Sequence, residues 1–194
     1  FGGGPGVDAD KLIGLTRNGA NISLEPGGQL ELSGAPLKTI HETASELNQH
    51  LDELRGISDE IGAGFIALGA APIWSHEVMP VMPKGRYTLM TDYMDRVGTM
   101  GKFMMYRTSC VQVNLDFSSE ADMVQKMRVA VALQPIATAL FANSPFFDGL
   151  PNGHKSWRSR VWQDLDAERT GMLPFIYEPG FGIEAWDEYA LDVP

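Results

Sequence analysis

The sequence predicts an α+β protein whose mainly antiparallel sheet is flanked by long helices. Two runs that alternate apolar and polar residues, 21–25 and 29–33, are joined by a turn-forming Pro-Gly-Gly at 26–28. Long segments with three/four apolar spacing follow, which is the spacing of amphipathic helices. Strand and helix patterns do not alternate in a regular βαβ rhythm, so antiparallel pairing is expected for the strands.

The two alternating runs form the first predicted element, a β-hairpin. Because successive side chains of a strand point to opposite faces, the apolar residues share one face and the polar residues share the other. The apolar set is Ile22, Leu24, Leu30 and Leu32, and the polar set is Ser23, Glu25, Gln29 and Glu31. The hairpin is therefore expected to bring two carboxylates and an amide together.

A glycine-rich opening precedes the hairpin, and a long helix follows it. Residues 1–6 suit a loop or a tail. Apolar residues recur at helical spacing from Pro36, expected as the first helical residue, to Gly62, expected as the stop. The outer face of this helix is predicted to carry the acidic residues Glu42, Glu46, Asp52, Glu53, Asp59 and Glu60.

The middle of the chain is predicted to contain short elements. Residues 65–68 are a candidate apolar strand, a proline-punctuated loop covers 72–83, and 86–97 is predicted to be helical. The next clear strand is predicted over 109–117, where one face is apolar and the other polar. Its apolar residues are Val111, Val113, Leu115 and Phe117, and they alternate with Cys110, Gln112, Asn114 and Asp116.

A second long helix and a mixed C-terminal segment complete the predicted fold. The run 119–122 resembles a capping box, and Pro135 is expected to kink the helix that follows it. Three basic residues then cluster between 155 and 160. A short apolar run at 173–177 precedes an acidic tail.

Composition excludes several classes of protein. The 194 residues are 44% hydrophobic, which excludes a disordered chain, and the net charge of −10 argues against a basic nucleic-acid or lipid surface. The single cysteine, Cys110, excludes an intramolecular disulfide and a thiolate zinc cage. With no signal peptide pattern and no apolar span near the roughly 18 residues of a membrane helix, we expect a soluble, cytoplasmic protein.

Metal binding is the sharpest hypothesis that the polar faces support. Such a face is ordinarily solvated, but here it is rich in oxygen and contains no lysine, which suits a hard cation such as Mg²⁺. The set comprises Glu25, Gln29, Glu31, Gln112 and Asn114. Arginines could bind phosphate or carboxylate beside it, although each is individually typical of a surface charge. They are Arg86, Arg107, Arg158, Arg160 and Arg169.

Four motifs, in order along the chain, carry a resemblance to a known family. They cover 22–36 (ISLEPGGQLELSGAP), 82–87 (MPKGRY), 111–123 (VQVNLDFSSEADM) and 166–175 (DAERTGMLPF). Together they closely resemble glutamate-cysteine ligase of the plant and proteobacterial type. The resemblance extends from about Leu12 to Pro194 and corresponds to less than half of a full-length family member.

The resemblance implies a fold and a reaction. The fold is glutamine-synthetase-like, in which an antiparallel sheet forms the floor of a funnel and its polar face binds metal and nucleotide. The reaction uses ATP and Mg²⁺ to phosphorylate the γ-carboxylate of glutamate, and the amine of cysteine then attacks to give γ-glutamylcysteine, the first step of glutathione synthesis. Carboxylates for the metal beside arginines for phosphate agree with this chemistry.

The resemblance also implies roles for individual residues. The metal ligands would be Glu25, Gln29, Glu31 and Gln112, and Gln112, Asn114 and Arg169 would contact the nucleotide. The substrate contacts would be Arg86, Tyr87, Thr108, Val113 and Arg158. Of these, Arg86 and Arg158 are the expected catalytic residues, and Arg169 has a structural alternative.

The sequence also departs from the family pattern. The upstream metal-binding strand and the C-terminal half of the family are missing from residues 1–194, so the chain is expected to be a central segment of the catalytic domain. Cys110 alone cannot form the redox disulfide of plant members. Three alternatives stay open: another carboxylate-amine ligase of the same superfamily, a non-catalytic fragment that keeps a ligand-binding sheet, and a structural domain whose acidic helix meets a partner.

Overall fold

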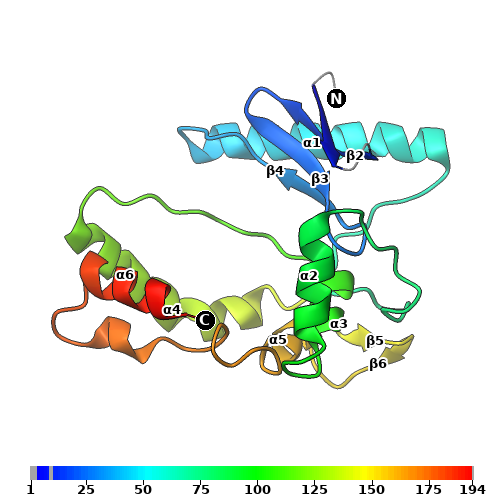
Figure 1. The fold of residues 1–194 in the computed structure, drawn as a ribbon. Coiled ribbons are helices and arrows are strands. Elements are labelled where there is room, and N and C mark those ends of the chain that lie inside the picture. Colours follow the sequence, from blue (N-terminus) through cyan, green and yellow to red (C-terminus); the bar gives the residue numbers. More distant parts are fainter. Residues whose placement is uncertain (1–3, 9–10, 194) are drawn as a thin grey trace. The chain divides into compact units, whose positions relative to one another are not determined.

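Strands dominate the beginning of the chain and helices the remainder in the computed structural model, which describes residues 4–8 and 11–193 (Figure 1). The predicted α+β class is confirmed. The strands are β1 (Gly4–Asp8), β2 (Lys11–Arg17), β3 (Ala20–Leu24), β4 (Leu30–Ser33), β5 (Phe146–Phe147) and β6 (Leu150–Pro151). The helices are α1 (Ile40–Ile61), α2 (Gly85–Met94), α3 (Gly101–Arg107), α4 (Glu120–Leu140), α5 (Trp157–Trp162), the 3-10 helix η1 (Pro174–Tyr177) and α6 (Ile183–Asp192).

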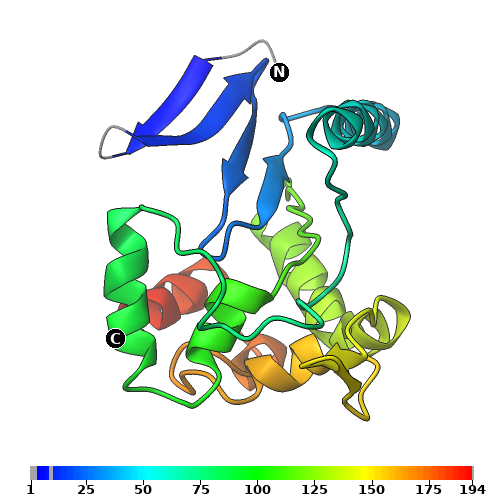
Figure 2. The ribbon, with the colours of Figure 1, turned by 90° about the vertical axis from the view of Figure 1, so that its right-hand side faces the viewer.

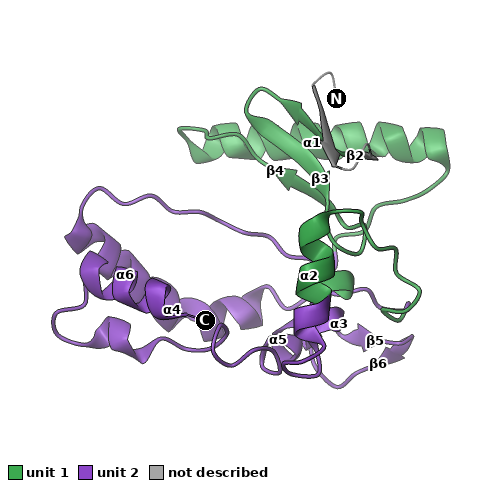
Figure 3. Ribbon diagram, in the orientation of Figure 1, with its two compact units in different colours: residues 1–67, 75–91, 105–107 green, residues 68–74, 92–104, 108–194 purple. Residues whose placement is uncertain are grey.

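The chain divides into two compact units (Figure 3). Unit 1 contains the sheet β1–β4, helix α1, most of α2 and the end of α3. Unit 2 contains the β5–β6 hairpin and the helices α4, α5, η1 and α6. Unit 1 comprises 1–67, 75–91 and 105–107, and unit 2 comprises 68–74, 92–104 and 108–194.

The sheet of unit 1 has the order β1-β2-β3-β4, and each neighbouring pair is antiparallel. In the β3–β4 hairpin, Ile22 pairs with Leu32 and Ser23 pairs with Glu31. This register places the apolar residues on one face and the polar residues on the other, so the predicted hairpin is confirmed. The N-H of Gly28 donates to the carbonyl of Glu25 (2.7 Å) and closes the turn. Gly28 has a φ of 79°, which a residue without Cβ adopts readily.

The expectation of a loop or tail over 1–6 is wrong for the part that the structure describes. Residues Gly4–Asp8 form β1, which pairs with β2, while residues 1–3 lie outside the described residues. Glycines have low strand propensity, so the local pattern gives no strand signal. Backbone pairing with β2 supplies the hydrogen bonds that the pattern could not predict.

Helix α1 begins later than expected. Its N-cap is Thr39, whereas the sequence pattern predicted Pro36 as its first residue. Thr39 accepts from the N-H of Glu42 (3.2 Å), and the Glu42 carboxylate accepts from the N-H of Thr39 (2.9 Å). This reciprocal capping box satisfies two donors at once. Gly62 ends the helix in the left-handed region, as predicted. α1 lies alongside the sheet (Figures 1 and 2), and an Arg17–Glu53 ion pair of 2.8 Å ties it to β2.

Unit 2 has two apolar clusters. One is built on Phe103 and Val161, with Phe147 and Trp157 packed against it. The other contains Met123 of α4, the fully buried Ile176 of η1 and Phe181, and Ala185 and Trp186 of α6 pack against it. Ser119 is the predicted N-cap of α4 and accepts from the N-H of Asp122, but the Asp122 carboxylate accepts from the N-H of Ser118, so the expected capping box is only half formed. Pro135 lies inside α4, so its expected kink stays a prediction.

The strand predicted over 109–117 is wrong. These residues form no strand, and every one of their side chains is exposed, with Val111 94% exposed. A strand exists through backbone bonds to a neighbour, and within residues 4–8 and 11–193 no strand pairs with this segment. The alternating pattern therefore lacks the partner that would convert it into a strand.

Two smaller predictions also change. Residues 65–68 are not a strand, and the helix expected over 86–97 is the shorter α2. The apolar run at 173–177 is largely the 3-10 helix η1, where Pro174 stands at the first position. Helix α3 was not predicted, because its mixed sequence GKFMMYR has no clear apolar periodicity. None of the helices formed by the described residues is long and apolar enough to cross a membrane.

Candidate functional site

Glu25 lies where the β3–β4 hairpin turns, and three side chains approach its carboxylate. The hydroxyl of Tyr87 donates to Oε2 at 3.3 Å, and the hydroxyl of Ser23 lies 3.4 Å from Oε1. The ammonium of Lys84 is 3.8 Å from Oε1. Glu31 stands opposite Ser23 on the same face and accepts from the hydroxyl of Ser33 at 3.3 Å. The polar face therefore presents two carboxylates beside a lysine that the sequence analysis did not single out.

Tyr87 connects the hairpin to the basic segment before α2. Only 1% of Tyr87 is exposed, and its phenol oxygen accepts from both Lys84 Nζ and Arg86 Nη2, each at 3.2 Å. The bond to Tyr87 raises the pKa of Arg86 above its ordinary value, and the charges of Glu25 and Glu31 add to the effect. Arg86 is therefore a permanent, exposed cation next to two carboxylates, suited to a phosphate or a substrate carboxylate.

Gln29 holds the turn in place. Its Oε1 accepts from the N-H of Gly27 at 2.8 Å, and its Nε2 donates to the carbonyl of Met105 at 3.2 Å. The amide thus bridges the turn and the end of α3. Its expected role as a metal ligand stays a prediction, and a cation would have to share an oxygen that already accepts from the backbone.

The fit of a metal can be judged from these contacts. Among the described residues, no three His, Cys, Asp or Glu side chains are grouped as a metal site. Glu25 and Glu31 lie on the same face of the β3–β4 hairpin, so together they could offer two carboxylates to a cation whose shell is completed by water or phosphate. Mg²⁺ is commonly held in this way.

Four predicted residues lie in or beside the extended segment of unit 2. Val113 is 74% exposed, and the side chains of Gln112 and Asn114 are exposed as well. The amide of Gln112 contacts Cys110 Sγ at 3.2 Å. Thr108 uses its hydroxyl to donate to the carbonyl of Met104 at 2.7 Å. The ligand roles assigned to these four residues stay predictions.

Arg158 lies on α5, where Ser156 accepts from the N-H of Ser159 and begins the helix. Its guanidinium stacks on the ring of Trp162 at 5.1 Å. The Nε of Arg158 is buried without a hydrogen-bond partner. Such an unsatisfied donor is costly unless a ligand or water meets it, which is consistent with the carboxylate contact expected for Arg158.

Arg169 is engaged by its own unit. It donates to Asp166 Oδ2 and to the hydroxyl of Tyr93, both at 2.5 Å, and Tyr93 donates to the same Asp166 oxygen at 2.5 Å. Asp166 is buried, and its second oxygen accepts from the N-H of Glu168. This closed network favours the structural role of Arg169, and its nucleotide contact stays a prediction.

The Asp166 network should make the stability of unit 2 depend on pH. The hydrogen bond from Tyr93, with that from Arg169, lowers the pKa of Asp166 below its ordinary value of 3.8. A lowered pKa adds stability above the ordinary value, and this stability is lost as pH falls through the lowered one. Thermal unfolding should therefore show Asp166→Asn less stable than the parent at neutral pH, with the difference shrinking below pH 3.8.

Asp187→Asn, on the exposed surface of α6, is the matched control and should leave the melting temperature unchanged. A difference between Asp166→Asn and the parent that stays constant from neutral to acid pH would contradict the role given to the Asp166 carboxylate.

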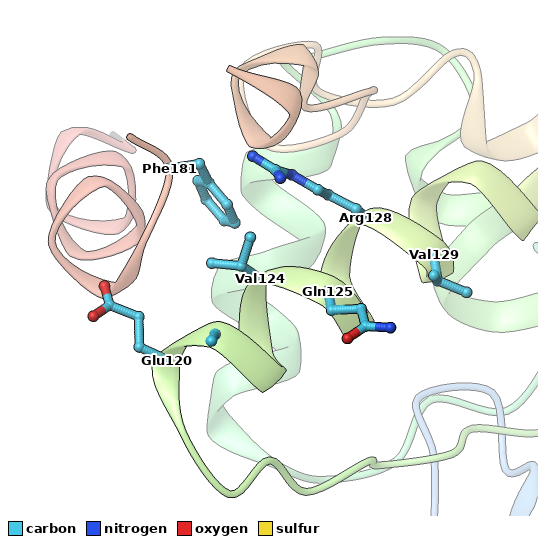
Figure 4. A pocket seen from close by; sticks show the side chains of 7 residues that line it. Glu120, Val124, Gln125, Arg128, Val129 and Phe181 are labelled. Carbon is cyan, nitrogen blue, oxygen red and sulfur yellow. The ribbon is translucent and has the colours of Figure 1, made fainter. Parts of the chain in front are cut away.

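An open groove of about 520 Å³ lies along α4 (Figure 4). Figure 4 shows Phe181 facing Val124 and Arg128 extending from α4. The charged groups at its margin are already used: Arg128 donates to the carbonyls of Ile176 and Glu178, and Glu120 accepts from the N-H of Ile183. These hydrogen bonds join α4 to η1, to the residue that follows it and to the start of α6.

Comparison with known proteins identifies close relatives. A model of the Glutamate-cysteine ligase family 2 (GCS2) matches residues 7–194. The chain is 58% identical over 188 residues to the chloroplastic glutamate-cysteine ligase of Arabidopsis thaliana, covering 97% of this chain and 36% of that protein. The chloroplastic enzyme of Medicago truncatula is 56% identical, with 97% and 37% covered. Chloroplastic glutamate-cysteine ligase B of Oryza sativa subsp. japonica is 55% identical, with 97% and 38% covered.

The chain thus spans little more than a third of the length of these curated relatives. The relatives are chloroplastic by name, so the cytoplasmic location expected from the sequence is wrong. The motifs at 22–36 and 82–87 that suggested the family are the segments that form the Glu25 and Tyr87 cluster. Lys84 belongs to the second motif, so its place in that motif is the sequence feature that could have marked it as a site residue.

Proposed function

Because the chain belongs to the glutamate-cysteine ligase family 2, we propose that the protein ligates the γ-carboxylate of L-glutamate to the amine of L-cysteine with the cleavage of ATP. A γ-glutamyl phosphate is the proposed intermediate, and γ-glutamylcysteine, ADP and phosphate are the products. The observation that carries this proposal is the family match along 7–194, together with identities of 58% and 56% to named ligases. The names of these relatives support a plastid as the compartment.

Glu25 and Glu31 are proposed to hold Mg²⁺, which supplies charge neutralisation for phosphoryl transfer when bound. Gln112 and Asn114 are proposed to contact the metal or the nucleotide. The carboxylates of the hairpin support the metal role by sharing one face of the sheet, near Arg86. Gln29 holds the turn that follows Glu25 through its bonds to Gly27 and Met105.

The substrate contacts are proposed for arginines. Arg86 is fixed by the phenol of Tyr87 and would neutralise a phosphate or a substrate carboxylate. Arg158 would bind a carboxylate of glutamate, and its unpartnered Nε supports that role. Thr108 and Val113 are proposed for the amino-acid pocket on the resemblance alone.

The glutamine-synthetase-like fold is part of the proposal. The chain would be the central segment of a catalytic domain whose antiparallel sheet forms the floor of the site. Family membership supports this architecture, and so does the polar face of the antiparallel sheet in unit 1.

ADP release should depend jointly on glutamate, cysteine and Mg²⁺ in the full chain. The coupling is expected because the amine of cysteine consumes the acyl phosphate that ATP and glutamate form. A coupled spectrophotometric assay for ADP, with each component left out in turn, measures it. Mass spectrometry of the product should show γ-glutamylcysteine.

Activity with a different amine acceptor in place of cysteine would overturn the cysteine assignment and favour another carboxylate-amine ligase. Calorimetric binding of Mg-ATP without any turnover would favour a fragment that only retains the ligand-binding sheet.

A further inference from the structure

Lys84 is a partly buried cation beside the proposed metal site, with 11% of its side chain exposed. Two backbone hydrogen bonds in succession connect Lys84 to the hairpin turn. The N-H of Lys84 donates to the carbonyl of Met82, and the N-H of Met82 donates to the carbonyl of Pro26, which adjoins Glu25. The carbonyl of Lys84 in turn accepts from the N-H of Tyr87 (2.9 Å). The ammonium is therefore held near Glu25 by the fold.

The phenol of Tyr87 has no bonding capacity left over for a fourth partner. A phenol has one donor proton and two acceptor lone pairs. Tyr87 donates to Glu25 and accepts from Lys84 and Arg86. Two cations and one carboxylate thus converge on a single oxygen atom, and the ammonium of Lys84 also faces Glu25 Oε1 at 3.8 Å.

This arrangement opposes the binding of a divalent cation by itself. A cation that approached Glu25 would meet the positive charge of Lys84 in a partly desolvated setting, where like charges repel strongly. A polyphosphate changes the balance, because its oxygens offer the ammonium a new partner. Glu25 would then be free to bind the cation.

We propose that Lys84 is the internal counter-ion of Glu25, and that it makes the binding of a divalent cation and a polyphosphate at this site mutually dependent. The proposal rests on the function proposed above, since it assigns Glu25 to the metal. In this positioning role, the ammonium of Lys84 pairs with the Glu25 carboxylate while no phosphate is bound. When a phosphate binds, the ammonium pairs with the phosphate and the carboxylate becomes available to the metal.

The test measures binding rather than turnover, in the full chain with Lys84 replaced by methionine. Mn²⁺ is the metal probe, followed by electron paramagnetic resonance, and inorganic tripolyphosphate is the anion probe, followed by calorimetry. Lys84→Met should bind Mn²⁺ alone about tenfold more tightly and tripolyphosphate about tenfold more weakly. The increase in Mn²⁺ affinity that tripolyphosphate produces in the parent should largely disappear.

Two control variants separate charge from structure. Lys155→Met removes an exposed lysine of unit 2 and should leave both affinities unchanged. Lys84→Arg keeps the positive charge and should retain the coupling between Mn²⁺ and tripolyphosphate. Should Lys84→Met fail to fold by circular dichroism, Lys84→Gln replaces it, with the same expected changes.

The outcomes distinguish this inference from the proposed function. Equal Mn²⁺ and tripolyphosphate affinities in parent and Lys84→Met would overturn the counter-ion role while leaving the ligase assignment intact. Absence of Mn²⁺ binding in parent and variant, with and without tripolyphosphate, would overturn the metal role of Glu25 and the counter-ion role with it.

Discussion

Replacing Gly27 by alanine is expected to unseat the hairpin turn and to lower the free energy of unfolding by about 3 kcal/mol. A Cβ at this position would lie 2.1 Å from the carbonyl oxygen of Tyr106 and 2.8 and 2.9 Å from its carbonyl carbon and Cα. These are backbone atoms of α3, so no side-chain rotation can relieve the overlap. Urea unfolding followed by circular dichroism measures the loss.

The same substitution should also weaken the proposed metal site, because the N-H of Gly27 is bound by Gln29 and Glu25 begins the turn. Gly56→Ala is the matched control, since a Cβ on Gly56, within α1, has no atom within 4 Å. Removing a glycine from a helix should stabilise that variant by about 0.5–1 kcal/mol. Equal stability of Gly27→Ala and the parent would contradict the close approach of the turn to α3.

Replacing Glu25 by glutamine is expected to reduce the turnover of the full chain about 100-fold or more. Glutamine keeps the size of the side chain and can still accept from the hydroxyl of Tyr87, but it removes the charge that would hold Mg²⁺. The Mg²⁺ concentration needed for half-maximal rate should rise. Steady-state ADP release at a series of Mg²⁺ concentrations measures both effects.

Glu60→Gln makes the same charge change at an exposed position near the end of α1 and should leave the rate unchanged. An unaltered rate and an unaltered Mg²⁺ dependence in Glu25→Gln would remove Glu25 from the metal site. Loss of rate with unchanged Mg²⁺ dependence would instead assign Glu25 to holding Tyr87, Lys84 and Arg86.

Local patterns predicted the elements whose signals lie within a few residues. The β3–β4 hairpin has its alternation and its turn residues in one short stretch, and the N-cap of α4 follows from Ser119. The start of α1 was missed by a few residues, because Pro36 and Thr39 both offer start signals and the capping box of Thr39 prevails.

Predictions failed where the secondary structure of a segment depends on pairing with another segment of the chain. Residues 109–117 alternate as well as the hairpin does, yet they have no paired strand in the part of the chain that the structure describes. Conversely, β1 has a weak glycine-rich pattern and is a strand because β2 lies beside it. Pairing depends on what lies next to a segment, and a local pattern carries no information about that.

The candidate site shows the same division. The sequence by itself determined that Glu25, Gln29 and Glu31 share one face of a hairpin, because alternation and turn chemistry are local, and its motifs indicated the family. Only the tertiary structure decided that Tyr87, separated from Glu25 by 62 positions, bonds to it and gathers Lys84 and Arg86 on one oxygen. Hydrogen bonds of this kind depend on positions in space that no local periodicity encodes, so the counter-ion of Glu25 could be found only from the folded chain.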